Sequence, residues 1–248
     1  MGLLFAVAFA CEFVDSSLGM GYGTTLTPLL MLLGFGPLRV VPVVLLSEFI
    51  TGLTAGGFHQ SLGNANFRRG SRDRGVVAVL SLAGVVGAIV AVFVAVSISK
   101  VALKLYIAVM ILAMGILILW RRNHRSSFSW SKIAGLGLIS AFNKGMSGGG
   151  YGPIVTGGQI LSGCEGRTAV GCTSIAEALI CLVGVISYVF VKGWPDPVLA
   201  LPIIVGATIS APCAALTTKV LDRKTRLEVL IGIVVLVLGA VTLWKALA

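Results

Sequence analysis

Two glutamates lie inside apolar segments of this chain, where ionisable residues are rare. Glu48 lies in VVPVVLLSEFITGLTAGGF and Glu177 in TAVGCTSIAEALICLVGVISYVF. A charge inside a membrane costs at least about 2.5 to 3.5 kcal/mol, so each acid needs a proton, a polar partner or water. We predict Glu48 and Glu177 as proton-coupling residues, because burial favours the protonated form of a carboxyl group. The alternative is a permanently protonated acid that donates to the backbone of a broken helix.

A glycine-rich repeat accompanies the two acids. GMGYG occupies residues 19–23 and GGGYG occupies residues 148–152, an offset of 129 residues. At the same offset Glu48 aligns with Glu177, and a duplication of this kind is typical of transport proteins. The other identical pairs are Tyr22 with Tyr151, Thr27 with Thr156, Leu32 with Leu161, and Gly34 with Gly163.

The two glycine pentads are expected to meet near the membrane midplane and to bind one anion together. Glycine adopts positive φ readily and leaves the backbone N–H groups unshielded. A helix is predicted to begin directly after each pentad, and the unpaired N–H groups and positive dipole end of a helix start attract negative charge. The predicted substrate-binding residues of the two turns are Gly19, Gly21, Tyr22, Gly23, Thr24, Gly148, Gly149, Gly150, Tyr151 and Gly152.

Close packing of helices is the alternative explanation for glycine in apolar segments. We assign that role to four glycines outside the pentads. Close packing does not explain why both pentads contain Gly-Tyr-Gly and why both lie between short apolar segments. The four packing glycines are Gly84, Gly87, Gly232 and Gly239.

Lys144 occupies the position in the second half that Asp15 occupies in the first. A buried lysine also requires a partner. We expect Lys144 either to pair with Asp15 or cap a helix, or to contact the anion directly, and we include it in the predicted substrate site. Glu12 ranks below Glu48 and Glu177 because its matching position holds Ala141.

The amino-acid composition indicates that membrane-spanning helices position the acids, Lys144 and the glycine turns. Of the 248 residues, 57% are hydrophobic and 11% are charged, and the mean hydropathy is +1.02. Soluble domains have about a quarter charged residues, so the chain is predicted to be an all-α integral membrane protein in a lipid bilayer. The net charge of +10 arises from short basic loops between spans, which does not require a nucleic-acid partner.

The apolar segments divide into two similar halves, each with an interrupted opening segment and three spans. Residues 2–35 as one straight helix would measure about 50 Å against a bilayer core of about 30 Å, which favours a re-entrant hairpin. The first repeat, 1–125, comprises a hairpin at 2–35 and spans near 40–58, 76–98 and 101–120; the second, 126–248, comprises a hairpin at 133–162 and spans near 168–190, 198–217 and 226–245.

The basic residues support hairpins over single crossings. With hairpins, thirteen basic residues share one face and five the other, whereas single crossings would split them ten to eight. Each half then has odd topology, so the repeats are inverted and both termini lie on the outer side of the cell inner membrane. The thirteen are Arg68, Arg69, Arg72, Arg74, Arg121, Arg122, Arg125, Lys132, Arg167, Lys219, Arg223, Lys224 and Arg226; the five are Arg39, Lys100, Lys104, Lys192 and Lys245.

Histidine and cysteine do not form a recognisable catalytic or metal-binding pattern. His59 and His124 fall at span ends, where we expect them to be solvated. No metal site, cofactor or catalytic set is predicted. The five cysteines are expected to pack in helices, with a sulfur-relay role for Cys172 or Cys181 as the alternative.

The sequence GGGYGPIVTGGQILSG followed by RTAVGCTS resembles the TauE/SafE sulfite exporter family, also called the 4-toluene sulfonate uptake permease family. The resemblance extends over nearly the whole chain. The first half departs more, because Met20 replaces the middle glycine of its turn. The resemblance implies a secondary transporter of sulfite, sulfonates or related sulfur anions driven by the proton gradient. A passive anion channel and a membrane sulfur-relay protein are the alternatives.

Overall fold

The computed structural model describes residues 1–120, 128–220 and 225–247, and every element in these ranges is an α-helix. The expected all-helical class is therefore confirmed. The helices are α1 (Gly2–Leu18), α2 (Tyr22–Leu32), α3 (Pro37–Ser61), α4 (Arg72–Ser97), α5 (Lys100–Trp120), α6 (Trp130–Ser147), α7 (Tyr151–Leu161), α8 (Gly166–Lys192), α9 (Pro197–Val220) and α10 (Thr225–Leu247).

Among the described residues, five helices are long and apolar enough to cross a bilayer, which makes the chain a multi-pass membrane protein. They are α3, α4, α5, α8 and the part of α9 up to Thr218. These agree with five of the six predicted spans to within a few residues. The sixth predicted span, 226–245, falls on α10, whose described apolar part is Gly232–Leu247. The predicted repeat boundary at residues 125 and 126 lies outside the described residues.

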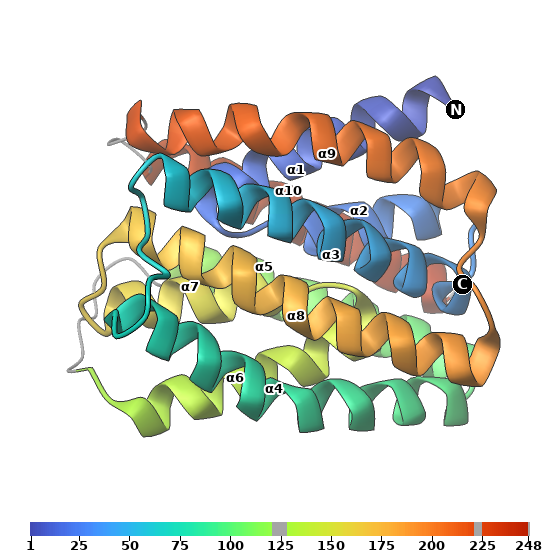
Figure 1. Ribbon diagram of the computed structural model, residues 1–248. Coiled ribbons are helices and arrows are strands. Elements are labelled where there is room, and N and C mark those ends of the chain that lie inside the picture. The colour runs from blue at the N-terminus through green and yellow to red at the C-terminus, as the bar shows by residue number, and fades with distance from the viewer. Residues whose placement is uncertain (121–127, 221–224, 248) are drawn as a thin grey trace.

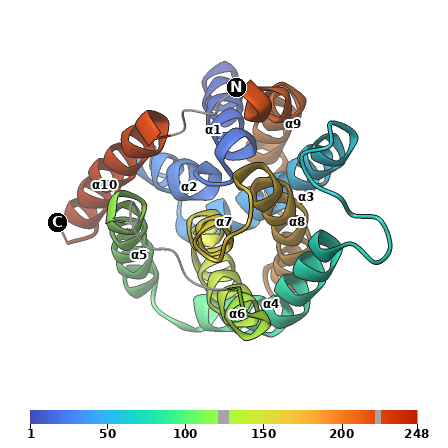
Figure 2. The same cartoon turned by 90° about the vertical axis from the view of Figure 1, so that its left-hand side faces the viewer.

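Two helix pairs do not run the full length of the molecule. In Figure 1, α1 enters from the right-hand end and stops midway, and α2 returns to that end. From the left-hand end, α6 runs inward and α7 returns to the left. The start of α1 and the end of α10 lie at the right-hand end, and Figure 2 shows α7 near the centre with α2 beside it, surrounded by longer helices.

Glycine breaks both pairs at the same point of the repeat. Gly19 and Gly148 end α1 and α6 in the left-handed region, each with φ of 73°, a conformation that side chains disfavour. Gly150 precedes α7 with φ of 82°. Because the backbone reverses within a few residues, each turn stays inside the helical bundle rather than reaching a surface loop.

Helix packing is similar for helices that match at the offset of 129 residues. The first helix of each half packs on the fourth helix of the other half: α1 packs on α9, and α6 packs on α4. The third helices of the halves, α3 and α8, pack on each other, as do α5 and α10. These close approaches need small residues; a side-chain carbon at Gly87, for example, would lie 2.5 Å from the Leu138 carbonyl oxygen of α6. Gly84, Gly232 and Gly239 meet neighbouring helices in the same way, which confirms the packing role predicted for all four.

Described basic residues separate between the two ends of the bundle. The α3–α4 loop and the starts of α6 and α8, all at the left of Figure 1, carry the first group; the starts of α3 and α5 and the ends of α8 and α10 carry the second. The first group comprises Arg68, Arg69, Arg72, Arg74, Lys132 and Arg167, and the second Arg39, Lys100, Lys104, Lys192 and Lys245. Arg121, Arg122, Arg125, Arg223 and Lys224 lie outside the described residues, as do the side chains of Lys219 and Arg226.

Candidate functional site

The two glycine turns touch each other in the middle of the bundle. A side-chain carbon at Gly152 would lie 2.5 Å from the Gly19 carbonyl oxygen, and one at Gly23 would overlap the Gly148 carbonyl oxygen. A carbon at Gly149 would lie 2.8 Å from the Thr24 nitrogen. The turns therefore need glycine because each one packs against the backbone of the other. Gly21 and Gly150 complete the turns, and Thr24 donates to the Gly21 carbonyl oxygen at 3.1 Å.

The tyrosines that follow the turns are both fully buried. The Tyr22 hydroxyl lies 2.6 Å from Ser47 Oγ. The Tyr151 hydroxyl has no hydrogen-bond partner among the described residues, because Ala176 stands where the first half has Ser47. The tyrosines thus occupy matching places with different polar surroundings.

A hydrogen-bond network secures the second hairpin to the first turn. Thr156 Oγ1 donates to the Gly19 carbonyl oxygen at 2.7 Å and lies 2.8 Å from Thr173 Oγ1. Gln159 Nε2 donates to the same Thr173 oxygen at 3.0 Å. This network connects α7 and α8 with the end of α1, so the turns and the acid-bearing helices form one packed unit.

Lys144 lies one turn before the second glycine turn and joins the two predicted proton-coupling acids. Its ammonium group forms ion pairs with Glu48 of α3 and, at 2.7 Å, with Glu177 of α8. The three residues are 1%, 4% and 5% exposed, so solvent screens the charges little. Ion pairing, one of the two roles expected of Lys144, is present, but its partners are Glu48 and Glu177 rather than Asp15.

The side chain of Asp15, near the end of α1, instead caps the start of α2. Its Oδ1 accepts the backbone N–H of Tyr22 at 3.1 Å. A carboxylate at this position is stabilised by the positive end of the helix dipole. In the second half, no side-chain hydrogen bond to the first amides of α7 is found within the described part of the chain. The two turns therefore differ in whether an acid of the chain already uses their amides.

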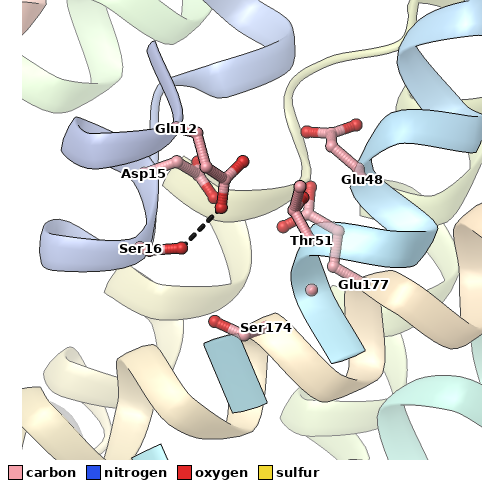
Figure 3. Close-up of a pocket in the computed structure, with 8 residues that line it drawn as sticks. Glu12, Asp15, Ser16, Glu48, Thr51, Ser174 and Glu177 are labelled. Carbon is pink, nitrogen blue, oxygen red and sulfur yellow. Dashed lines mark hydrogen bonds between the residues drawn. The ribbon is translucent and has the colours of Figure 1, made fainter. Parts of the chain in front are cut away.

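Beside the first turn lies a small acidic cavity, drawn in Figure 3. The centre of a water molecule can move within about 10 Å³ of this cavity, which is close to the space that one water molecule requires. The lining follows α3 and α8 from their acids toward the end of the bundle that carries the α3–α4 loop. The lining residues are Glu12, Asp15, Ser16, Glu48, Thr51, Gly52, Ser174 and Glu177.

Glu12, which the repeat argument ranked below Glu48 and Glu177, lines the same cavity as both of them. It is 2% exposed, lines this cavity from α1, and accepts the Ser16 hydroxyl at 2.5 Å on Oε1. A signal in the sequence was available: Glu12, Asp15 and Ser16 are spaced three and four residues apart, which places them on one helical face. Among the described residues, no group of three or more histidine, cysteine or acidic side chains is arranged to hold a metal ion.

The expected solvation of His59 is wrong. His59 is fully buried, because the chain after α3 folds back over it. Its Nδ1 lies 3.0 Å from Asn64 Nδ2, and its Nε2 lies 3.1 Å from the Ser16 carbonyl oxygen. Since the amide nitrogen can only donate, Nδ1 accepts and Nε2 donates to Ser16. His59 thus holds the end of α1, whereas His124 lies outside the described residues.

Broken helices packed inside a multi-pass helical bundle, with buried ion pairs beside their turns, define a membrane transport protein that handles a small molecule. The comparisons identify the family: the family profile "Sulfite exporter TauE/SafE" matches residues 4–242, so the chain belongs to that family. It is 28% identical over 252 aligned residues to the "Probable membrane transporter protein YtnM" of Bacillus subtilis (strain 168), covering 96% of this chain and 80% of that protein. No solved structure matches the chain.

Proposed function

We propose that this membrane transporter moves a small sulfur-containing anion, such as sulfite or a sulfonate, together with protons. The observation that carries the proposal is the buried Lys144, paired with one acid from each half and adjacent to the second glycine turn. Lys144 is the only described cation within this buried acidic cluster, and an anionic substrate inside a bilayer needs a cation or a set of amides.

Charge balance links the anion to the proton. If an anion takes the place of Glu48 or Glu177 on Lys144, the released carboxylate is left buried without a cation. An unpaired buried charge is costly, so that acid then binds a proton. Anion and proton therefore favour each other's binding, which produces transport of both in the same direction. Glu48 and Glu177 act as proton-coupling residues in this scheme.

The second turn is the better place for the anion. The first turn already donates its Tyr22 amide to Asp15, and that carboxylate repels a second negative charge. At the matching position the second turn has Lys144, which attracts one. The turns must separate to admit the anion, because their backbones are in contact. The complete proposed substrate site comprises Lys144 with Gly19, Gly21, Tyr22, Gly23, Thr24, Gly148, Gly149, Gly150, Tyr151 and Gly152.

Two inverted-topology repeats, 1–125 and 126–248, supply this site in the proposal, with α1–α2 and α6–α7 as re-entrant hairpins from opposite faces. The matched packing of α1 on α9 and α6 on α4 supports this arrangement. The thirteen-to-five division of basic residues expected from the sequence favours the cytoplasm for the end that carries the α3–α4 loop. Both termini then lie on the outer side of the plasma membrane.

A thiol-based sulfur relay has one observation in its favour, since Cys181 Sγ lies 3.9 Å from Glu48 Oε2. Cys181 is fully buried, however, which keeps it from any exposed donor. In the loop before α8, partial burial raises the pKa of the Cys164 thiol and so lowers its thiolate fraction. Replacement of all five cysteines by serine is expected to leave transport intact, and loss of it would favour the relay.

The test is radiolabelled sulfite uptake into proteoliposomes under an imposed pH gradient. The wild type should accumulate sulfite against its gradient, and Glu48→Gln with Glu177→Gln should abolish accumulation. Glu165→Gln, at an exposed acid paired with Arg167, is the matched control and should behave as wild type. Flux that survives the double substitution without accumulation would indicate a passive channel. Absence of proton-dependent flux with sulfite and with sulfonates would reject the proposal.

A further inference from the structure

Two carboxylate oxygens without partners line the same cavity. Glu12 Oε2 and Glu48 Oε1 are buried and have no hydrogen-bond partner among the described residues. In Figure 3 the Glu12 carboxyl group points from α1 toward the side on which Glu48, Thr51 and Glu177 lie. Buried polar atoms in native proteins are almost always paired, and the cavity has room for about one water. A single water could therefore bridge the two acids.

Glu12 differs from the other acids of the cavity in its partners. Glu48 and Glu177 share Lys144, and Asp15 accepts the amide at the start of α2. Within the described ranges, the groups that hold Glu12 are the neutral hydroxyls of Ser16 and Thr51, and neither is a cation. A buried carboxylate without a cation is costly, so Glu12 is the acid of this cavity that most favours a bound proton.

We propose that Glu12 is the proton-loading residue of the transport cycle: it takes up the proton from the end of the bundle that carries the α3–α4 loop and passes it through one water to Glu48. This inference rests on the proposed function. In the transfer, the O–H bond at Glu12 Oε2 breaks as the water accepts that proton, and the water gives one of its own protons to Glu48 Oε1. Glu12 becomes a carboxylate and Glu48 a carboxylic acid, with the water regenerated.

The transfer explains how the anion gains access to Lys144. A neutral Glu48 no longer holds the ammonium group as an ion pair, whereas Glu177 still does. Lys144 then has one carboxylate fewer and can accept an anion from the second glycine turn. Glu12 thereby couples the uptake of a proton beside the first turn to the binding of an anion at Lys144 beside the second turn.

The groups that face Glu12 determine its titration. None of them is a cation except Lys144, and the described part of α9, residues 197–218, contains no charged residue. Two of these groups already have hydrogen-bond partners: Tyr22 pairs with Ser47, and His59 pairs with Ser16 and Asn64. The ionisable groups around Glu12 are Cys11 and Asp15 on α1, Tyr22 on α2, Glu48 and His59 on α3, Lys144 on α6 and Glu177 on α8.

Infrared difference spectroscopy of the purified protein tests the proton site without a substrate. The wild type should show the carbonyl band of a protonated carboxyl group, shifted in D2O and lost at high pH. Glu12→Gln should remove that band, and Glu165→Gln should retain it. Should Glu12→Gln fail to fold, Glu12→Asp keeps the group and should shift the band. A band that stays unchanged in either Glu12 variant would overturn the assignment.

Sulfite uptake tests the role in transport. Glu12→Gln should lower proton-driven accumulation by roughly 100-fold, the lower range for a positioned proton-transfer group, while sulfite exchange without a pH gradient persists. Accumulation at the wild-type rate would overturn the proposal. If the wild type itself does not move sulfite, the proposed substrate fails, and the infrared band still decides whether Glu12 holds the proton.

Discussion

The two broken helix pairs, α1–α2 and α6–α7, share a backbone path but differ in charge beside the turn. The first pair carries Glu12 and Asp15, and the second carries Ala141 and Lys144 at the matching positions. The glycine contacts, by contrast, are reciprocal, since each turn packs on the carbonyl group of the other. The comparison teaches that two turns with the same backbone path can differ in charge through a few residues, which give the first turn an acidic side and the second a basic side.

The hydrogen bonds that stabilise the turns also differ between the halves. Thr156 donates to the opposite turn, but the hydroxyl of its counterpart Thr27 has no hydrogen-bond partner among the described residues. The first half has Val44 where Thr173 completes the network of the second. The two hairpins are therefore held to the bundle by different hydrogen bonds, the first through His59 and Ser47 and the second through Thr156.

Removal of the basic side should have the largest effect. Lys144→Met leaves Glu48 and Glu177 buried without a cation, which should cost about 3 to 5 kcal/mol of stability. Thermal unfolding in detergent measures the loss. Adding Glu48→Gln and Glu177→Gln to Lys144→Met should restore much of it, because no buried charge then remains in the triad. A triple variant as unstable as the single one would contradict this account.

A methyl group between the turns should have the next largest effect. In Gly23→Ala the new carbon overlaps the Gly148 backbone, which cannot move cheaply, so stability should fall by about 1 to 3 kcal/mol. Gly36→Ala is the control, because nothing lies within 4 Å of that position. Size-exclusion profiles after heating would compare the two. Equal tolerance of both substitutions would show that the turns are not in contact.

The tyrosine environments offer a smaller test of the symmetry between halves. Ser47→Ala removes the partner of the Tyr22 hydroxyl and should lower stability by about 1 kcal/mol. Ala176→Ser places a hydroxyl at the matching position in the second half, where the Tyr151 hydroxyl lacks a partner among the described residues. It should raise the unfolding temperature. A decrease would mean that the halves differ in geometry as well as in sequence.

The smallest effect is expected outside the membrane, where Arg39 pairs with Asp196. The hydrogen bond from Arg39 lowers the pKa of Asp196 below its ordinary value, and the Val198 and Leu199 amides act in the same direction. A lowered folded-state pKa means that this stabilisation is present above about pH 3.9, the unfolded value, and is lost as pH falls through the folded pKa. Asp196→Asn should therefore flatten the acid end of the stability curve measured by thermal unfolding. An unchanged curve would show that the pair contributes nothing.

Much of the fold could be predicted because hydropathy and glycine act locally. The spans near 40–58 and 168–190 were expected within a few residues of α3 and α8. The burial of His59 could not be predicted, since it depends on Asn64 and on the end of α1. A histidine at a helix end carries no sign in the sequence of the segment that will cover it.

The candidate site was predicted in part. The repeat offset singled out Glu48 and Glu177, and the structure places both on one lysine. The same offset led to Glu12 being ranked low, because its counterpart is Ala141. A repeat identifies what two halves share, so it is blind to a residue that only one half has.

The sequence by itself determined that the chain is helical, apolar enough for a membrane, and interrupted by glycine at two points 129 residues apart. These properties depend on neighbouring residues and on periodicity along the chain. Only the tertiary structure decided which acid meets Lys144, which turn has its amide occupied by Asp15, and that Glu12 lines a cavity with Glu48. Ion pairs and cavities require atoms a few ångströms apart, and segments far apart in sequence reach that distance only when the whole bundle has packed.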